Sequence, residues 1–215
     1  MILDLLDFIL LFEIEMQNIT NLFKRPMDST SKVMVADELV PLFPQTNEKL
    51  KSIIQKIPLT SKVLFHYKKG DGMSKDWKWW ALEMMEKGME TPGIVQLAGE
   101  DLNLNFLEFS SLVHNMFKEL EIDLVDDDVY YQYAIYIAHQ VVNGELASEK
   151  GLEILTEAAI NTDYHDAFMS FYHLEDDAEL LRDGFCIGKG DGYMQKSNIE
   201  EWMYQYFEKL IKFNE

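Results

Sequence analysis

Carboxylates are the side chains with the most evident chemical use in this sequence, and many of them lie in two clusters. The chain contains 38 Asp and Glu against 19 Lys and Arg, so its net charge is -19. The first cluster includes Asp126, Asp127 and Asp128, and the second includes Glu175, Asp176 and Asp177. Such clusters can hold a metal ion that activates water, or they can bind a partner with a basic surface.

The spacing of the histidines bears on the metal alternative. A metal site on a helix needs two ligands three or four residues apart, and no two of the five histidines have this spacing. His165 beside Asp166, and His173 close to Glu175, keep a metal-dependent hydrolase open as an alternative. The pattern favours histidines at the surface or at the edge of the core. We therefore expect no catalytic residue, no metal site and no cofactor.

The sequence Lys-Gly-Asp-Gly occurs twice, at 69–72 and at 189–192. A phosphate-binding loop needs Gly-Lys-Ser/Thr at the start of a helix, and neither copy has that order. An EF-hand needs regularly spaced oxygen ligands and a distal Glu, which are also missing. We therefore predict two turns in which glycine takes a positive φ.

The single cysteine, Cys186, lies among apolar residues, which favours a small buried side chain over a nucleophile. One cysteine forms no internal disulfide, so the sequence favours a cytoplasmic location. The apolar N-terminal residues lack the basic start of a signal peptide. No stretch approaches the ~20 uncharged apolar residues that a membrane-spanning helix needs, so we expect no membrane partner.

The negative charge is uneven along the chain. Residues 1–96 contain 12 Lys/Arg and 13 Asp/Glu, residues 97–183 contain 3 and 20, and residues 184–215 contain 4 and 5. Solvated helix faces and first turns of helices can explain each cluster taken singly. Concentrated charge also destabilises a folded chain, which favours a functional reason such as a basic partner. Phosphates would be repelled, so nucleic acid is not expected as a direct ligand.

Two consecutive tyrosines follow the first cluster, and aromatic residues beside carboxylates suit a surface that binds cations. The predicted partner-binding residues are Asp126, Asp127, Asp128, Tyr130, Tyr131, Glu175, Asp176 and Asp177.

Helices must position these residues, because apolar residues recur at three- and four-residue spacing along most of the chain. The predicted helices span 48–57, 75–89, 106–120, 129–142, 149–159, 164–172, 176–181 and 197–213. Asn47 and Ser148 are the predicted caps of the helices that follow them. Residues 62–67 favour a short strand or the start of a helix. Short connections make neighbouring helices antiparallel. The predicted fold is therefore mainly α, with antiparallel helical hairpins that form a bundle or a short irregular α-solenoid. The sequence also allows one small β-hairpin around residues 185–193.

Three tryptophans, Trp77, Trp79 and Trp80, lie within the predicted helix at 75–89. Adjacent positions on a helix point about 100° apart, so at least one of these side chains must lie near the surface. An exposed tryptophan is a candidate for an interface.

Residues 1–45 are predicted to form an N-terminal helix, at 2–23, and an irregular connection, whereas residues 46–215 form an acidic helical domain. The helix at 2–23 is apolar around most of its circumference. It is therefore expected to be buried on more than one side or to support a homodimer.

Three segments follow one another in a recognisable order: Ala81 to Gly88, Thr91 to Gly99, and a helix that ends at Glu119-Leu120-Glu121-Ile122. This order, over residues 79–160, resembles immunity proteins of bacterial polymorphic-toxin and contact-dependent growth inhibition systems. The resemblance implies a cytosolic antitoxin, not an enzyme, that occludes the active site of a cognate toxin, often a basic nuclease. The apolar N-terminal helix departs from the pattern. An acidic protein that mimics DNA is a further alternative, which differs only in its partner.

Overall fold

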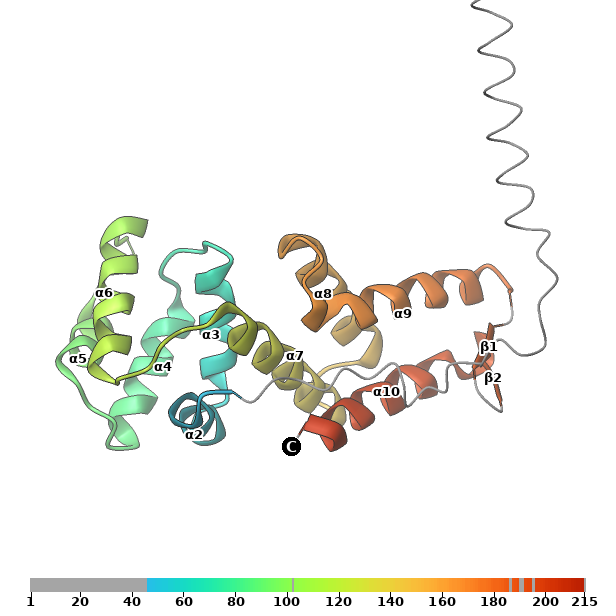
Figure 1. Cartoon of the computed structure of the whole chain (residues 1–215), viewed down its shortest axis with the longest axis horizontal. Coiled ribbons are helices and arrows are strands. Elements are labelled where there is room, and N and C mark those ends of the chain that lie inside the picture. The colour runs from blue at the N-terminus through green and yellow to red at the C-terminus, as the bar shows by residue number, and fades with distance from the viewer. Residues whose placement is uncertain (1–45, 102, 186, 190–191, 195, 215) are drawn as a thin grey trace, which may run out of the picture. The chain divides into compact units, whose positions relative to one another are not determined.

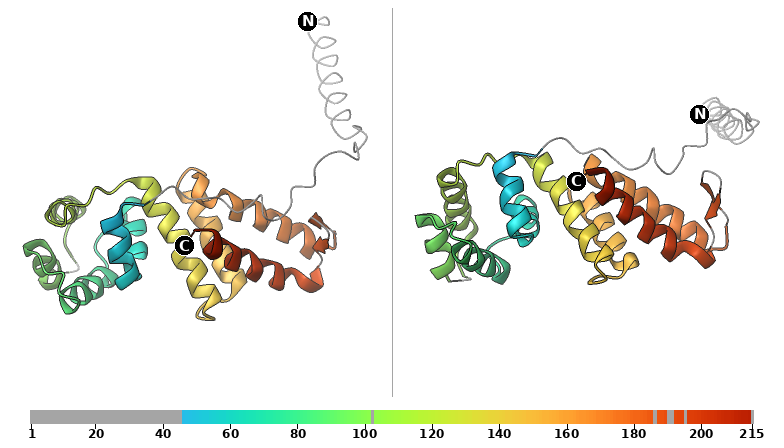
Figure 2. Two further views of the ribbon diagram at one scale, coloured as in Figure 1. Left: turned by 60° about the horizontal axis from the view of Figure 1, so that its bottom comes forward. Right: turned by 90° about the horizontal axis from the view of Figure 1, so that it is seen from below.

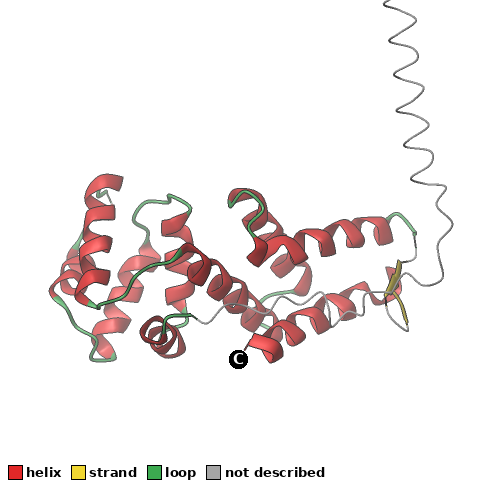
Figure 3. Ribbon diagram, viewed as in Figure 1, coloured by secondary structure: helices red, strands yellow, loops and turns green. Residues whose placement is uncertain are grey.

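The computed structural model describes residues 46–101, 103–185, 187–189, 192–194 and 196–214. The predicted helix at 2–23, its connection, the homodimer contact assigned to it and Cys186 lie outside these residues. Within them helices make up nearly all of the regular structure (Figure 1, Figure 3). The prediction of a mainly α fold is therefore confirmed.

The elements follow one another with short connections. They are α2 (Glu48–Lys56), α3 (Leu59–Lys68), α4 (Lys75–Glu86), α5 (Pro92–Gly99), α6 (Phe106–Glu119), α7 (Asp126–Val142), α8 (Ser148–Asn161), α9 (Asp166–Arg182), β1 (Ile187–Lys189), β2 (Gly192–Met194), the 3-10 turn η2 (Lys196–Asn198) and α10 (Ile199–Asn214). The two strands are antiparallel, and Ile187 pairs with Met194.

The first helices begin and end where their local sequence specifies it. The side chain of Asn47 caps α2 and accepts a hydrogen bond from the backbone nitrogen of Lys49 at 3.0 Å. Residues 62–67 are helical and belong to α3, which ends where Gly70 takes a φ of +92° and the Asp71 nitrogen donates to the His66 carbonyl at 2.9 Å. The first Lys-Gly-Asp-Gly sequence thus terminates a helix, whereas Lys189 and Gly192 of the second lie in the paired strands.

The segment from Thr91 to Gly99, which is not among the predicted helices, contains the two-turn helix α5. The Thr91 hydroxyl accepts a hydrogen bond from the Ile94 nitrogen at 3.4 Å, and Pro92 occupies the first helical position, which its fixed φ favours. These two signals are in the sequence. The apolar spacing alone is too short to reveal the helix.

Three further helix boundaries differ from the prediction. Helix α7 begins at Asp126, so residues 126–128 form its first turn, where carboxylates are favourable. Ser148 is the first residue of α8 rather than its cap, and α9 is one helix where two were expected. Neither Pro nor Gly interrupts α9, and Leu174 and Ala178 are buried in its middle. At 17 residues, α7 and α9 are the longest described helices, yet no helix in the described part is long and apolar enough to cross a membrane.

Helix α7 is the central element of the described region. It packs against α3 on one side and against α8, α9 and α10 on the other (Figure 1). Figure 2 shows α10 alongside α7 and α9 in two further views. A glycine permits the closest of these contacts, because a Cβ atom on Gly151 of α8 would lie 2.5 Å from Cγ2 of Val141 and 3.2 Å from the ring of Phe207.

The three tryptophans of α4 do not all lie on the same side of the helix, as the helical periodicity requires. Trp77 and Trp80 are buried in the core, and the indole nitrogen of Trp80 donates to the Thr60 hydroxyl at 2.8 Å. Trp79 is 65% exposed. The expectation that one of the three tryptophans lies at the surface is confirmed.

Candidate functional site

Lysines from the start of the described region bind two carboxylates of the cluster at residues 119–128. Lys49 on α2 forms an ion pair with Glu121, and Lys68 on α3 forms one with Asp126. The Lys68 amine also donates to the Leu124 carbonyl at 3.0 Å. The excess negative charge of this segment is therefore partly neutralised by the fold itself.

The three predicted aspartates at the start of α7 differ in their surroundings. Asp126 is exposed and paired with Lys68. Asp128 is only 8% exposed, and its carboxylate accepts a hydrogen bond from the Asn47 nitrogen at 3.4 Å. Asp128 therefore joins α7 to the start of α2 and is not the surface charge that the sequence predicts. The side chain of Asp127 lies outside the described part of the structure.

Tyr130 and Tyr131 pack against the core and are only partly exposed. Their rings both contact His165, with centroids 4.8 Å and 5.8 Å away. Burial, followed by the nearby charge of Asp126, raises the pKa of Tyr130. These tyrosines join α7 to the beginning of α9, which is a structural role.

The second predicted cluster divides along α9. Glu175 accepts a hydrogen bond from Arg182 at 2.9 Å, and the same guanidinium donates to Glu149 of α8 at 2.9 Å. Arg182 thus bridges the two helices, and Glu175 is committed to that bridge. Asp177 is partly buried and also has an interaction partner, whereas Asp176 is exposed.

The two predicted clusters do not converge on one site. Tyr130 and Tyr131 contact His165, the residue that caps the start of α9, whereas Asp176 lies eleven residues further along. At 1.5 Å per residue this corresponds to about 16 Å along the helix axis. The partner-binding residues predicted from the sequence therefore form two separate groups.

Helices α8 and α9 with their flanking turns, residues 143–185, carry eleven Asp/Glu against Lys150 and Arg182. Both cations have local partners, because Lys150 pairs with Glu153 at 2.7 Å and Arg182 binds Glu149 and Glu175. The remaining carboxylates of this hairpin give it a strongly negative surface.

A group that we call the tyrosine–carboxylate face lies on this hairpin. It consists of Tyr164, Tyr172, Asp176 and Glu179. The two tyrosine rings meet edge to face with centroids 5.4 Å apart. Asp176 and Glu179 lie four and seven residues after Tyr172 and so share its side of α9. The negative charge of Asp176, then the neighbouring Tyr164, and finally the charge of Glu179 raise the pKa of the Tyr172 hydroxyl.

The turn that presents this face has an unusual backbone. Asp163 and Tyr164 have φ angles of 54° and 60°, in the left-handed region that is unfavourable for a bulky residue. The Tyr164 nitrogen donates to the Ala159 carbonyl at 2.7 Å, which closes the end of α8. Tyr164 remains 48% exposed. Such strain costs about 1–3 kcal/mol per residue and is frequent at functional sites.

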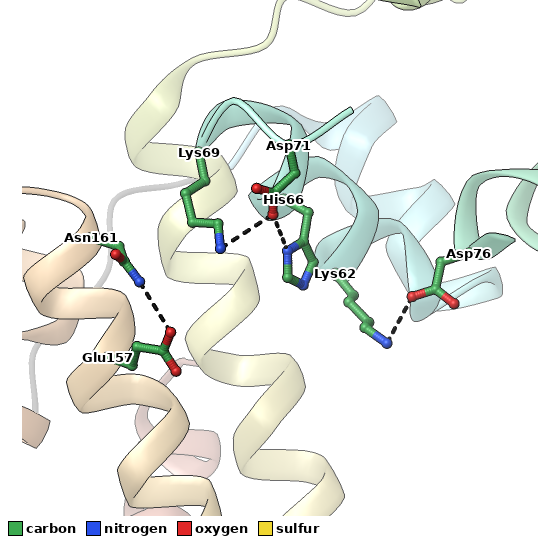
Figure 4. Close-up of polar contacts among 7 residues, drawn as sticks. All are labelled: Lys62, His66, Lys69, Asp71, Asp76, Glu157 and Asn161. Atoms are coloured by element: carbon green, nitrogen blue, oxygen red, sulfur yellow. Dashed lines mark hydrogen bonds and ion pairs between the residues drawn. The ribbon is translucent and has the colours of Figure 1, made fainter. Parts of the chain in front are cut away.

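A second polar cluster lies at the end of α3, opposite α8 (Figure 4). The Asp71 carboxylate contacts Nδ1 of His66 at 2.8 Å and the amine of Lys69 at 3.2 Å. Partial burial raises the pKa of Asp71, but the hydrogen bonds from His66 and Lys69 outweigh it and lower the pKa overall. Because the same residues close the end of α3, this cluster has a structural explanation.

The histidines of the metal alternative lie apart from any suitable set of ligands. Nδ1 of His165 accepts a hydrogen bond from the Ala167 nitrogen at 3.2 Å and so caps α9. His173 is exposed and contacts the ring of Tyr172. Among the residues that the structure describes, no three His, Cys, Asp or Glu side chains are arranged to hold a metal ion.

Sequence reasoning missed Tyr164 and Tyr172 as surface residues, although both lie in a predicted helix. The only available signal was two tyrosines eight residues apart next to an acidic run. Their meeting depends on the left-handed turn, which the sequence does not reveal. The resulting arrangement can bind a cationic surface, because exposed rings and carboxylates both attract Lys and Arg. No protein family, curated protein or solved structure matches this chain.

Proposed function

We propose that this chain is a non-enzymatic immunity protein that inhibits a toxin domain with a basic surface, and that it binds this domain through the tyrosine–carboxylate face. The observation that carries the proposal is the pair Tyr164 and Tyr172 next to Asp176 and Glu179, on a hairpin whose two cations are already bound. The resemblance of residues 79–160 to immunity proteins supports the toxin as partner.

The four residues of the face would act in two ways. Asp176 and Glu179 attract a basic partner over a distance, which raises the association rate and makes it depend on salt. Tyr164 and Tyr172 supply a rigid apolar contact area with few rotatable bonds, which suits the centre of an interface. Binding of this kind inhibits a nuclease by covering the cations that hold its phosphate substrate.

The face is a better candidate than the start of α7. Asp126 already has a lysine partner and Asp128 is buried, whereas Tyr164 is 48% exposed. A partner that used the two aspartates would have to break existing interactions. Asp176 and Glu179 are exposed acids, so they are free to take part without that cost.

The test is a double substitution, Asp176→Asn with Glu179→Gln, measured for association with each candidate toxin domain that the neighbouring genes encode. We expect association at low salt to slow by about tenfold, and the salt dependence to become weaker, because two steering charges are lost. A matched control is Glu86→Gln with Glu90→Gln, two exposed acids near the end of α4. Unchanged kinetics in the first variant, or an equal loss in the control, would contradict the proposed face.

The tyrosines give an independent arm of the same test. Tyr164→Ser should increase the dissociation rate with little effect on the salt dependence, because it removes contact area and no charge. If no neighbouring toxin domain binds the unmodified chain at all, the proposed function itself is wrong.

A further inference from the structure

A cavity of about 610 Å³ lies between α2, the start of α3 and one side of α7, away from the tyrosine–carboxylate face. Its volume falls within the range of about 300–1,000 Å³ that is common for ligand sites. The side chains of Ile54, Leu59 and Ile135 line it and are only partly buried. Packing within the described region thus leaves an apolar surface open at this place.

Two of the amide side chains that line the cavity, those of Gln132 and Gln140, have their nitrogens engaged within the protein. Nε2 of Gln132 donates to the Thr46 hydroxyl at 2.9 Å, and Nε2 of Gln140 donates to the Glu145 carboxylate at 2.8 Å. The amide oxygens of both glutamines remain as acceptors. These two oxygens suit a ligand that donates hydrogen bonds.

The buried hydroxyl of Ser61 is a second observation that points to a ligand in this cavity. Ser61 lines the cavity, it is only 1% exposed, and its hydroxyl oxygen has no hydrogen-bond partner among the described residues. A buried hydroxyl without a partner is unfavourable by about 1–3 kcal/mol. A bound ligand would supply what is missing.

Two charged residues and one aromatic residue complete the lining. Glu145 is exposed at the end of α7, and Lys51 lies on α2. The Tyr136 ring is partly buried and stacks on Tyr133 at an interplanar angle of 21°. A carboxylate and an aromatic ring together bind a cationic group, while the lysine can bind a carbonyl oxygen.

We propose that this cavity binds a short extended peptide segment that carries a basic side chain. The N–H groups of the peptide donate to the side-chain oxygens of Gln132, Gln140 and Ser61, and its basic side chain binds Glu145 and Tyr136. Apolar neighbours in the peptide cover Ile54 and Ile135. This second site is separate from the proposed function, because it uses none of the residues of the tyrosine–carboxylate face.

The experiment is a titration of the isotope-labelled full chain, followed by NMR, with the capped peptide acetyl-Ala-Leu-Arg-Leu-Ala-amide. Two matched peptides carry norleucine or glutamate in place of arginine. We expect the arginine peptide to shift signals of α2, the start of α3 and α7, and to bind about tenfold more tightly than the norleucine peptide, which is the effect of one charge-assisted hydrogen bond. Signals of α9 around Asp176 should not move.

Two variants of the chain sharpen the test. Glu145→Gln should remove the preference for arginine and leave the norleucine peptide unaffected, because only the charge is lost. Ile135→Trp should fill the cavity and abolish binding of both peptides, and Leu82→Trp, at an exposed position on α4, is its control. Thermal unfolding checks that each variant is folded.

Several results would overturn the proposal: no shifts up to millimolar peptide, shifts confined to α9, or equal binding of the glutamate peptide. These outcomes do not depend on the proposed function, because the titration contains a peptide and no toxin domain. Conversely, loss of toxin binding in the Asp176 and Glu179 variant would leave the peptide result unchanged.

Discussion

The described region from α2 to α4 and the hairpin of α8 and α9 handle charge in opposite ways. Residues 46–90 carry nine lysines against six Asp/Glu, whereas residues 143–185 carry two cations against eleven acids. Lysines of the first region pair with acids of their own region and also with Glu121 and Asp126. In the second region, both cations are used and acids remain.

A cluster of acids in a sequence can therefore either be paired with lysines inside the fold or remain exposed at the surface. The acids around residue 121 contribute to the attachment of α2 and α3, because lysines from those helices reach them. On α9, Glu175 pairs with Arg182 of the same helix, whereas Asp176 and Glu179 remain exposed. Packing must hold this hairpin together against repulsion. Only the second outcome leaves charge for a partner.

The largest expected effect concerns that packing. Gly151→Ala places a methyl group 2.5 Å from Cγ2 of Val141, so α8 must move away from α7. We expect the free energy of unfolding to fall by about 3 kcal/mol, which is typical of overpacking in a core. Gly99→Ala is the control, since a Cβ there meets nothing within 4 Å, and it should not destabilise. Urea unfolding measures both. Equal effects would show that packing does not dominate in the acidic hairpin.

The next effect concerns alkaline pH and the helix that supports the hairpin. Burial raises the pKa of Tyr206 on α10 to about 12 from 10.0, although Ser170 acts in the opposite direction. The unfolded chain therefore loses this proton first, and the stabilisation present below pH 10 is lost as the pH rises toward 12. The loss should reach about 2 kcal/mol. Tyr206→Phe should remove this part of the pH dependence. A stability that is constant between pH 10 and 12 would contradict the burial of this ring.

Arg182 tests whether the cations of the acidic hairpin are structural. Arg182→Gln removes the charged bridge from Glu175 and Glu149, and it leaves the Glu175 carboxylate, already 22% exposed, without its cation. We expect a loss of about 1–2 kcal/mol in urea unfolding. Lys150→Gln is the control, because its pair with Glu153 is exposed and should contribute little. If both substitutions have the same small effect, the bridge between α8 and α9 is not structural.

The smallest expected effect is the change in stability when one acid is removed, and its sign differs between the two regions. Asp126→Asn should reduce stability by a few tenths of a kcal/mol, because it removes the partner of Lys68. Asp176→Asn should increase stability by a similar amount, because it reduces repulsion on α9. Thermal unfolding at low salt measures the two variants, and high salt should remove the difference. If both substitutions change the stability in the same direction, the two regions do not differ in how they use their acids.

The sequence predicted the elements whose signals are local. Helix α6 follows from a long apolar stripe, and the start of α2 follows from Asn47 as a cap. Helix α5 was missed because eight residues are too few for a periodic pattern. The continuity of α9 was missed because it depends on the burial of Leu174 and Ala178, and packing decides that burial.

The candidate site was less predictable than the fold, for a reason that also concerns distance. The concentration of acids was visible, but their partners lie far away in the sequence. Glu121 binds a lysine 72 residues earlier, and Asp128 binds a backbone nitrogen 81 residues earlier. No local pattern reveals such pairs. The exposure of Tyr164 depends in turn on two consecutive left-handed residues, of which neither is glycine.

That left-handed turn also affects what a partner encounters. A hydrogen bond to the Ala159 carbonyl fixes the main chain of Tyr164, and its ring packs against the ring of Tyr172. The Tyr164 side chain is therefore oriented before a partner binds. A preoriented residue loses little conformational freedom on association. Insertion or deletion of a single residue at 162–164 would change the direction of this ring relative to Tyr172. The length of this turn is therefore as constrained as the identity of the residues within it.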